Sequence, residues 1–412
     1  MYSISFKGPK YLEKFHCIGP DCEQTCCTGW TIDLDKETFK RYQKFKNWEF
    51  NGDFKRYFKK KFLPTRNAVS YGVLDLTKTK FCPFFTDKKL CAIHLKYGPE
   101  YLSLICDSYP RITNSIDDNY ERCLTLSCPE AARIVLFNNE KFEIKTYEES
   151  SKNRICINRT FKTDKATFFN KSKKHFYLLR DYSVNLLKDE SFELWERLMI
   201  LANFYTGIEQ LVIKKKIDQI PKFTEKSKNA GYNELLKKSA NAAYEHEEKK
   251  IVILVELFTK MKVKSKALKD YEEVYDSVEK AFDLENGINY KTINKIYNDS
   301  YSKYYQPFFS KNKHVLENYL LNHIYRDLFP FIAPTSAHQS LIILLVQYSI
   351  IKFHLLGYAS HNKRLTKEDI VKVVYSFHRV FTHYTPFYIN LVKFMKFNRL
   401  DNLKYLACLI KE

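Results

Sequence analysis

The stretch from His16 to Asp33 reads HCIGPDCEQTCCTGWTID and places four cysteines close together in the chain. Nine of the 11 cysteines lie between Cys17 and Cys128, which makes the first third of the chain unlike the rest. Thiolates are soft, anionic ligands, and four of them can complete a zinc tetrahedron or hold an iron-sulfur cube. The pattern therefore predicts that this region folds around a cysteine-held metal centre.

Eight of these cysteines are the candidate metal ligands: Cys17, Cys22, Cys26, Cys27, Cys82, Cys91, Cys106 and Cys128. The adjacent pair Cys26 and Cys27 needs a sharp turn to aim both sulfurs at one ion, and Gly29 supplies a flexible backbone nearby. More than four candidates with irregular spacing favour an iron-sulfur cluster, while zinc stays the alternative because ligand softness does not separate the two.

Other readings of the same side chains stay open. Free cysteine packs well as a small hydrophobic group, so any single thiol could belong to the core. Cys156 and Cys408 lie outside the pattern, and we expect both to be inert. His16 and His94 could replace a cysteine as ligand, although ordinary hydrogen-bonded histidines are more common.

The start of the chain, Met1 to Pro9, lacks the continuous apolar segment of a secretion signal. We therefore expect a cytoplasmic protein, in which reducing conditions favour metal-bound cysteines over disulfides. The most apolar stretch, Leu341 to Leu356, contains Gln347 and Lys352. It reads as too short and too polar for a membrane span and indicates a buried helix.

Composition favours a mainly α protein. The 412 residues are 45% hydrophobic and 16% aromatic, but only 10 are Gly and 12 are Pro, so few loops can adopt positive backbone angles. We expect two domains: residues 1–150 as a small, loop-rich α+β cysteine-cluster domain, and residues 151–412 as a helical domain.

Local signals place several elements. In the first part we expect a strand at Trp30 to Leu34, followed by a helix that is capped by Asp35 and runs to about Lys46. A loop-rich segment is expected from Pro64 to Lys80. Two further helices are expected, one that begins within Pro99 to Leu104 and one that opens at Pro129 and reaches Leu136. In the second part, long amphipathic runs from about Phe176 onward predict helices, among them Phe192 to Leu201, Ile251 to Phe258, and Ile370 to Val380 behind a capping box at Thr366.

The net charge of +20 is concentrated in the second part. Residues 1–150 hold 24 Lys and Arg against 20 Asp and Glu, which leaves 44 against 28 beyond them. Such an excess can attract nucleic acid or an acidic partner. Because acidic residues are interspersed with the lysines, solvated helix faces explain it better, and we do not expect a nucleic-acid partner.

Several pieces of the cysteine region together resemble the flagellin lysine-N-methylase family. The pieces are the His16 to Asp33 stretch, Cys82-Pro83-Phe84, Leu90 to Ile93, the block from Cys106 to Arg111, and Leu126 to Arg133. The resemblance spans residues 16–133, and its core cysteines are also similar to a wider class of zinc- or iron-chelating domains. It implies transfer of a methyl group from S-adenosylmethionine to lysine side chains of flagellin, with an iron-sulfur centre needed for activity.

Methyl transfer requires a neutral lysine amine aligned with the methyl donor, so a carboxylate or a tyrosine is expected near the amine. Asp107, Tyr109 and Arg111 are the candidate catalytic residues because they adjoin predicted ligands, and Glu130 is a further candidate. Each also has a simpler reading as an ion-pair partner, a packed ring or a helix start. The Gly-rich turn of a nucleotide-binding Rossmann fold is absent from the sequence, so the position of the cofactor pocket stays unknown.

The spacing of the cysteines does not match that of radical enzymes, and we do not expect radical chemistry. An alternative from a different class is a non-enzymatic zinc-binding module, whose basic helical domain docks on a protein or nucleic-acid partner. The sequence leaves the oligomeric state open.

Overall fold

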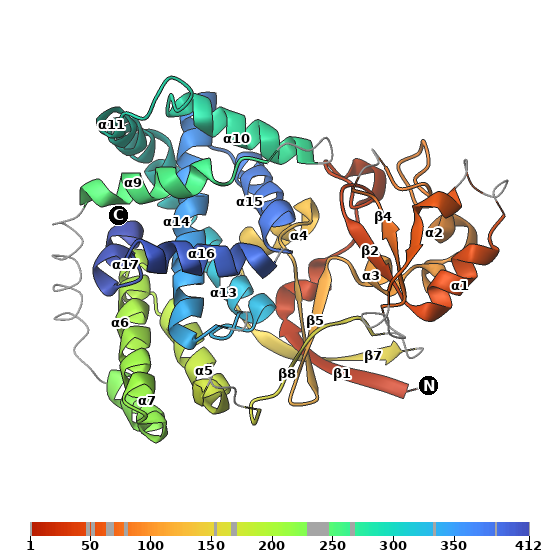
Figure 1. The fold of residues 1–412 in the computed structure, drawn as a ribbon, viewed down its shortest axis with the longest axis horizontal. Coiled ribbons are helices and arrows are strands. Elements are labelled where there is room, and N and C mark those ends of the chain that lie inside the picture. Colours follow the sequence, from red (N-terminus) through yellow and green to blue (C-terminus); the bar gives the residue numbers. More distant parts are fainter. Residues whose placement is uncertain are drawn as a thin grey trace.

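A computed structural model describes residues 2–46, 50, 54–62, 70–77, 81–151, 155–165, 171–228, 247–263, 268–332, 335–383 and 385–411. Figure 1 shows a small sheet with short helices at one end of the molecule and a large group of helices at the other end. A second sheet lies between them and contains the N-terminal strand.

The central sheet has five strands in the order β7-β1-β6-β5-β8. Their bounds are Tyr2–Pro9 (β1), Arg111–Ile116 (β5), Asn119–Leu124 (β6), Ile144–Ser151 (β7) and Ile157–Phe161 (β8). β1 pairs with β7 antiparallel and with β6 parallel, whereas β5 and β6 form a hairpin. Asp117 and Asp118 take positive φ angles of 48° and 66° in its two-residue turn, a conformation that aspartate tolerates better than most residues.

The predicted domain boundary near residue 150 falls within β7, and β7 and β8 pair into the same sheet as β1 and β5. The two-domain division stays a prediction.

The small sheet contains β2 (Thr31–Leu34), β4 (Gly72–Asp75) and β3 (Phe58–Lys60), in the order β2-β4-β3. Helix α1 (Lys36–Lys44) follows β2, and the Asp35 side chain caps it by accepting a hydrogen bond from Thr38 N. Gly72 is required where it stands, because a Cβ there would lie 2.3 Å from the ring of Phe39 on α1.

Three short helices complete the cysteine region: α2 (Ala92–Tyr97), α3 (Leu104–Ser108) and α4 (Pro129–Leu136). Pro129 occupies a first-turn position of α4, as expected from its fixed φ and missing N–H.

The remaining helices form the large helical part. They are α5 (Phe176–Leu187), α6 (Leu194–Ile213), α7 (Ile220–Lys228), α9 (Glu247–Thr259), α10 (Lys269–Ala281), α11 (Tyr290–Ser300), α12 (Gln306–Phe309), α13 (His314–Asp327), α14 (Ala337–Asn362), α15 (Lys367–Phe381), α16 (Thr385–Phe397) and α17 (Leu403–Ile410). Short 3-10 turns lie at Lys10–Lys14, Gly19–Asp21, Phe54–Tyr57, Pro99–Tyr101, Lys171–His175 and Ile217–Gln219, and Tyr301–Tyr305 is a π-helical turn.

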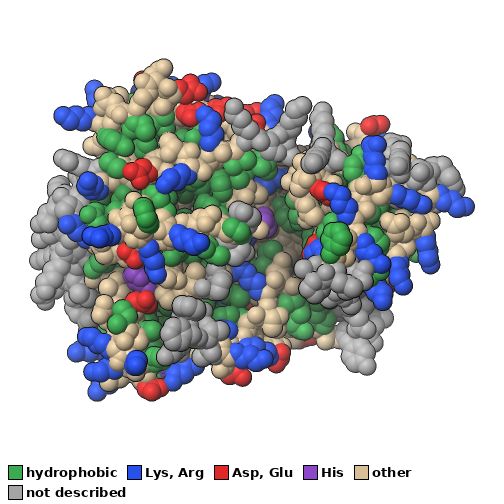
Figure 2. Space-filling view, in the orientation of Figure 1, with side chains coloured by type: hydrophobic (Ala, Val, Ile, Leu, Met, Phe, Trp, Pro, Cys, Tyr) green, Lys and Arg blue, Asp and Glu red, His purple; other side chains and the backbone are tan. Residues whose placement is uncertain are grey.

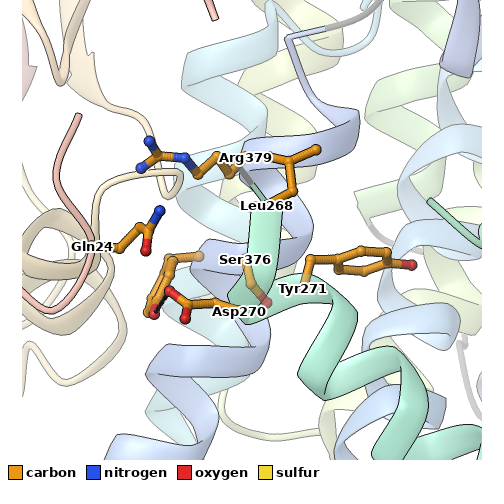
Figure 3. Close-up of a pocket in the computed structure, with 7 residues that line it drawn as sticks. Gln24, Leu268, Asp270, Tyr271, Ser376 and Arg379 are labelled. Carbon is orange, nitrogen blue, oxygen red and sulfur yellow. Dashed lines mark hydrogen bonds between the residues drawn. The ribbon is translucent and has the colours of Figure 1, made fainter. Parts of the chain in front are cut away.

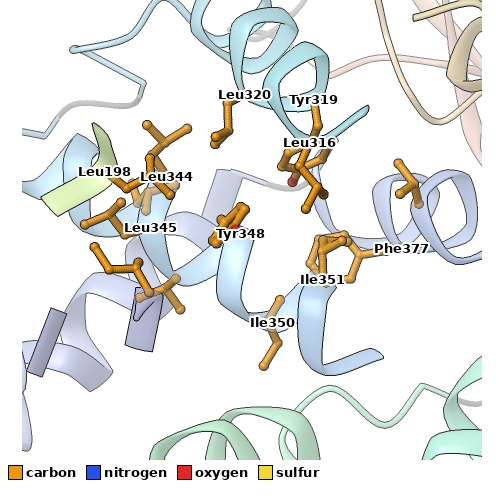
Figure 4. Close-up of a cluster of buried hydrophobic side chains, with 14 of the residues drawn as sticks. Leu198, Leu316, Tyr319, Leu320, Leu344, Leu345, Tyr348, Ile350, Ile351 and Phe377 are labelled. Carbon is orange, nitrogen blue, oxygen red and sulfur yellow. The ribbon is translucent and has the colours of Figure 1, made fainter. Parts of the chain in front are cut away.

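Buried apolar side chains form two separate clusters. The larger one extends from Tyr11 to Ile410 and joins the central sheet to the helices. In Figure 4, Tyr348 and Ile351 of α14 lie between side chains of α13 and Phe377 of α15. The smaller cluster lies under the small sheet and includes Leu34, Tyr42, Phe45, Leu74 and Phe84. The chain therefore has two cores of very different size.

Polar side chains at four-residue spacing on α13 join the helices to the central sheet. Asn318 donates to the carbonyl oxygens of Leu136 and Asn138, and Asn322 donates to that of Leu124. These donors satisfy backbone acceptors at the end of α4 and of β6, which water cannot reach because both asparagines are buried. The contacts fix the side of α13 that faces the sheet.

Helix α14 lies at the centre of the helical part. Among the described residues, α14 passes the test for a membrane span by length and composition alone. Its most apolar window is entirely buried inside the protein. Burial of this segment confirms the prediction of a buried helix. The judgement that the segment is too short and too polar was wrong, because the helix continues beyond Leu341 to Leu356 at both ends and is apolar enough by composition.

Most of the local predictions agree with the structure. The strand before Asp35, the helix at Pro129, and the capping box of Thr366 and Asp369 on α15 are all confirmed. Helix α1 ends at Lys44, two residues before the predicted end.

One local prediction needs correction. The segment from Pro64 to Lys80 contains β4, because Val73 and Leu74 pair with the strands on both sides; residues 63–69 and 78–80 lie outside the described residues. The helix expected to begin within Pro99 to Leu104 is α3, which begins at Leu104 behind its cap Ser103, whereas Pro99 to Tyr101 forms a 3-10 turn.

Candidate functional site

The cysteine region surrounds one cavity of about 320 Å³. All eight cysteines named as candidate ligands line it: Cys17, Cys22, Cys26, Cys27, Cys82, Cys91, Cys106 and Cys128. The four candidate catalytic residues Asp107, Tyr109, Arg111 and Glu130 line it too. Segments that are far apart in the sequence therefore contribute thiols and titratable groups to a single recess.

Short elements position these thiols. Cys91 and Cys128 directly precede α2 and α4, and Cys106 lies in the first turn of α3. Backbone N–H groups at the starts of helices have no partner within the helix. Those of Ile93 and His94 face the Cys91 sulfur, where they oppose the rise that burial causes in the pKa of this thiol.

Burial is the main influence on most of these thiols. It raises the pKa of Cys22 to about 11, and those of Cys106 and Cys128 to about 12. Burial also raises the pKa of Cys82. These cysteines are therefore held as neutral thiols at pH 7, and a bound cation would reverse the preference by stabilising the thiolates.

Cys26 is the exception. A hydrogen bond with the Cys27 thiol lowers the pKa of Cys26 to about 7, burial opposes this, and the charge of Arg379 assists it. The same hydrogen bond, followed by burial, raises the pKa of Cys27. Within this pair, Cys26 is the sulfur that more readily carries negative charge.

Cys26 lies near most of the other candidate ligands. Its charge influences the pKa values of Cys82, Cys91 and Cys106, and also those of Cys22 and Cys128. That these thiols share one centre stays a prediction.

Several of the thiols that line the cavity accept hydrogen bonds from backbone N–H groups. Besides the donors at Cys91, the N–H of Phe84 faces the Cys82 sulfur, and N–H groups of Glu130 and Ala131 face the Cys128 sulfur. Hydrogen bonds to cysteine sulfur are one of the means by which proteins tune iron-sulfur clusters. Within the described residues, no three His, Cys, Asp or Glu side chains are placed to hold a single metal ion. Thiolates are the ligands of both iron-sulfur clusters and zinc, so the types of donor that line the cavity fit either group. The identity of the ligands stays a prediction.

Two of the candidate catalytic residues, Tyr109 and Arg111, each lie against an aromatic ring. The Tyr109 ring lies 5.6 Å from that of Trp30, and its hydroxyl is 3.2 Å from Ser127 Oγ. Burial raises the pKa of Tyr109, which keeps the phenol protonated. The Arg111 guanidinium lies 5.0 Å from the centre of the Phe15 ring.

Asp107 is exposed in α3, next to Cys106. Glu130 pairs with Arg133, which also binds Glu23 beside Cys22. Glu130 also lies in the first turn of α4, which agrees with its simpler reading as a residue of a helix start.

The cysteines left out of the ligand set lie elsewhere. Cys123 is buried in β6, Cys156 is next to β8, and Cys408 is buried in α17. All 11 cysteines are described, and none forms a disulfide. His94 lines the cavity, whereas His16 contacts the Lys14 carbonyl with its Nδ1 at 3.3 Å.

Sequence reasoning missed two residues of the helical part that reach this region. His383 Nε2 is 2.8 Å from Ser127 Oγ, the same hydroxyl that contacts Tyr109. Arg379 on α15 donates to the Cys26–Cys27 turn. Figure 2 shows a hollow between the two parts of the molecule, with a histidine side chain visible in it. Basic residues near the end of a helix are common, so no signal in the sequence distinguished Arg379.

Comparisons with known proteins extend over nearly the whole chain. The family model described as the FliB lysine N-methylase C-terminal domain matches residues 180–409, which comprise most of α5 through α17. The chain is 22% identical over 397 residues to a lysine-N-methylase of Salmonella typhimurium, covering 92% of each chain, and equally similar to that of Salmonella choleraesuis.

A third relative is shorter. The flagellar biosynthetic protein FliU of Salmonella muenchen is 27% identical over 167 residues, which cover 40% of this chain and 96% of that protein. No solved structure matches the chain. Because the family model covers more than half of the residues, the chain belongs to the FliB lysine N-methylase family.

Proposed function

We propose that this protein is a lysine N-methyltransferase that moves a methyl group from S-adenosylmethionine to lysine side chains of flagellin, and that its cysteine cavity holds an iron-sulfur cluster. Membership of the FliB family supports the reaction class. The relatives named as lysine-N-methylases match along 92% of the chain, and the name of FliU supports a flagellar substrate. The convergence of eight cysteines on one cavity is the observation that carries the proposal for the cluster.

Four of the lining cysteines would hold the cluster, and Cys26, Cys27, Cys82, Cys91 and Cys106 are the first candidates because each of them interacts with at least one other member of this group. When bound, the cluster would supply a positively charged inorganic core that stabilises the thiolates and orders the surrounding loops. Zinc is the alternative occupant.

Asp107, Tyr109 and Arg111, which all line the cavity, would meet the substrates. The lysine amine must lose its proton before it can attack the sulfonium methyl, and Asp107 offers an exposed carboxylate to accept that proton. The Tyr109 ring would pack against the lysine side chain and exclude water from it. Arg111 would bind a carboxylate, such as that of the methyl donor.

In the transfer itself, the amine nitrogen forms a bond to the methyl carbon as the carbon-sulfur bond breaks, and the electron pair of that bond stays on sulfur. The products are methyl-lysine and S-adenosylhomocysteine. Holding the two reactants in line is the largest contribution expected of the protein. The reaction would take place in the cytoplasm, where thiols stay reduced.

The test is a methylation assay with anaerobically purified, metal-loaded protein, S-adenosylmethionine and flagellin, read by mass spectrometry of the lysine-containing peptides. Methyl-lysine that depends on the methyl donor is the expected result. No product with fully loaded protein would refute the reaction. Asp107→Asn should slow methylation by about a hundredfold or more if it accepts the proton. Asp87→Asn, at an exposed carboxylate outside the cavity lining, is the matched control.

Colourless protein with one zinc per chain and no methylation would favour the alternative of a non-enzymatic module. That alternative also predicts steep salt dependence of binding to any duplex. Failure to bind a duplex even at low salt would eliminate its nucleic-acid version.

A further inference from the structure

The turn that carries Cys26 and Cys27 is held by its carbonyl groups. Trp30 Nε1 donates to the Cys26 carbonyl at 2.6 Å, and Cys82 N donates to the Cys27 carbonyl at 2.7 Å. Both donors come from the cysteine region itself. Adjacent cysteines can face one centre only if the backbone between them is fixed in a sharp turn, so these contacts bear directly on the ligand geometry.

The flanking carbonyls are held from the other end of the chain. Arg379 Nη2 donates to the Thr25 carbonyl at 2.7 Å and to the Thr28 carbonyl at 3.1 Å. One nitrogen thus bridges the residues immediately before and after the cysteine pair. With Trp30 and Cys82, four consecutive carbonyl groups have a donor, and half of these bonds come from a single arginine of the helical part.

Helix α15, which carries Arg379, is itself fixed in place. The Tyr375 hydroxyl donates to Asp270 of α10 at 2.6 Å, and Lys372 pairs with Glu273 of α10 at 2.7 Å. Figure 3 shows Arg379 extending from α15 toward the loop that carries Gln24, with Asp270 and Ser376 beside it. The gap that remains at this junction is only about 10 Å³, too small for more than one water molecule. Contacts with α10 therefore fix the position of α15 and of the Arg379 guanidinium that contacts the turn.

We propose that Arg379 is a positioning residue of the metal centre: it clamps the Cys26–Cys27 turn and so makes the ligand geometry depend on the helical part. The inference rests on the proposed function insofar as that function makes the turn a metal site. Arginine suits this role because its planar, permanently charged group keeps a fixed geometry toward backbone acceptors.

The first measurement does not need metal. Amide hydrogen exchange of residues 25–29 is followed in the full-length chain as purified, for the wild type, Arg379→Gln and Lys367→Gln. Loss of two charge-assisted bonds should speed exchange in the turn by about tenfold or more in Arg379→Gln. Lys367→Gln removes an exposed charge from the first turn of the same helix and does not touch the turn, so its exchange should match the wild type. Equal exchange in Arg379→Gln and wild type would overturn the proposal.

The second measurement uses protein loaded with iron and sulfide. Loss of iron to a chelator should be about 10–100-fold faster in Arg379→Gln, as for other partners of metal ligands. The reduction potential should fall, because a positive charge near the cluster has been removed. Arg379→Lys keeps the positive charge, so its reduction potential should equal that of the wild type. Its loss of iron should still be fast, because lysine lacks the planar group of arginine. A merely structural role does not predict this separation of the two effects. A potential unchanged in Arg379→Gln would contradict the proposal.

The two proposals fail in different ways. If the wild type takes up no cluster but Arg379→Gln still speeds exchange in the turn, the proposed cofactor is wrong and the clamp stands. The wild type could instead be loaded and active, while Arg379→Gln changes neither the amide exchange of the turn nor the reduction potential. In that case the clamp is wrong and the proposed function stands.

Discussion

The cysteine region and the helical part are held together by different means. The helical part packs long helices around α14, whose side chains from Leu341 to Val346 are almost fully buried. The cysteine region has a small core under a three-stranded sheet, and many of its thiols face a cavity. Small cores supply only a few kcal/mol of stability, and metals commonly add the remainder. We therefore expect the helical part to be stable through burial, and we propose that the cysteine region depends on what its cavity binds.

The largest difference between the parts should come from removing a ligand. Cys82→Ala should abolish metal binding and unfold the cysteine region, because binding energy on the order of 10 kcal/mol is coupled to folding in structural metal sites. Metal analysis and hydrogen exchange of residues 81–108 would measure both effects. Cys123→Ala, at a buried thiol outside the cavity, should keep the metal. Equal metal content in the two variants would contradict the assignment of Cys82 as a ligand.

A core substitution should affect only the helical part. Leu344 of α14 is fully buried in the cluster of Figure 4, and Leu344→Ala should cost about 2–5 kcal/mol of unfolding free energy through lost burial and the cavity left behind. Chemical denaturation would measure it, with Leu344→Met as the volume-conserving control. Metal content should stay unchanged in both variants, and a loss of metal in Leu344→Ala would show that the two parts are not separate in stability.

Acid should weaken the helical part. Burial lowers the pKa of His354 on α14 to about 4, from a usual value of about 6.5. The unfolded chain therefore binds a proton below about pH 6.5 that the folded chain excludes until about pH 4, so stability present above pH 6.5 is lost as the pH falls through this window. The shift corresponds to about 3 kcal/mol.

His354→Leu should reduce that pH dependence in denaturation experiments between pH 7 and pH 4 without abolishing it, because burial also lowers the pKa values of His323, His378 and His383. An unchanged slope in His354→Leu would refute the assignment of this group.

The smallest effects come from two matched helix caps. Asp35 caps α1 in the cysteine region and Thr366 caps α15 in the helical part. Replacing either by Ala should cost about 1 kcal/mol. Hydrogen exchange should report local opening of the cysteine region for Asp35→Ala and a loss of global stability for Thr366→Ala. The same response to both substitutions would mean that the chain unfolds as one unit.

Local signals predicted much of the fold. Caps such as Asp35 and Thr366, and Pro129 at a helix start, depend on neighbouring residues, so they can be read from short windows. The five-stranded sheet was not predicted, because β1 pairs with β6 and β7, more than 100 residues away. Its strands have partners that periodicity within one segment does not reveal.

The residues of the cavity, too, could be predicted from the sequence only where short stretches identify them. Each cysteine stretch could be named as a ligand candidate, and the structure places all eight of these thiols at one cavity. The contributions of Arg379 and His383 could not be predicted, because both lie more than 250 residues beyond the cysteine region residues they contact. Which thiols ligate, and where the methyl donor binds, stay predictions.

The central claim is that the cysteine cavity holds an iron-sulfur cluster. The most direct test is the iron, acid-labile sulfide and zinc content of anaerobically purified wild-type protein, together with its visible absorption spectrum. We expect brown protein with roughly four iron and four sulfide per chain, as in a cubane cluster. Colourless protein that contains zinc or no metal, and takes up no iron when supplied with iron and sulfide, would contradict the account.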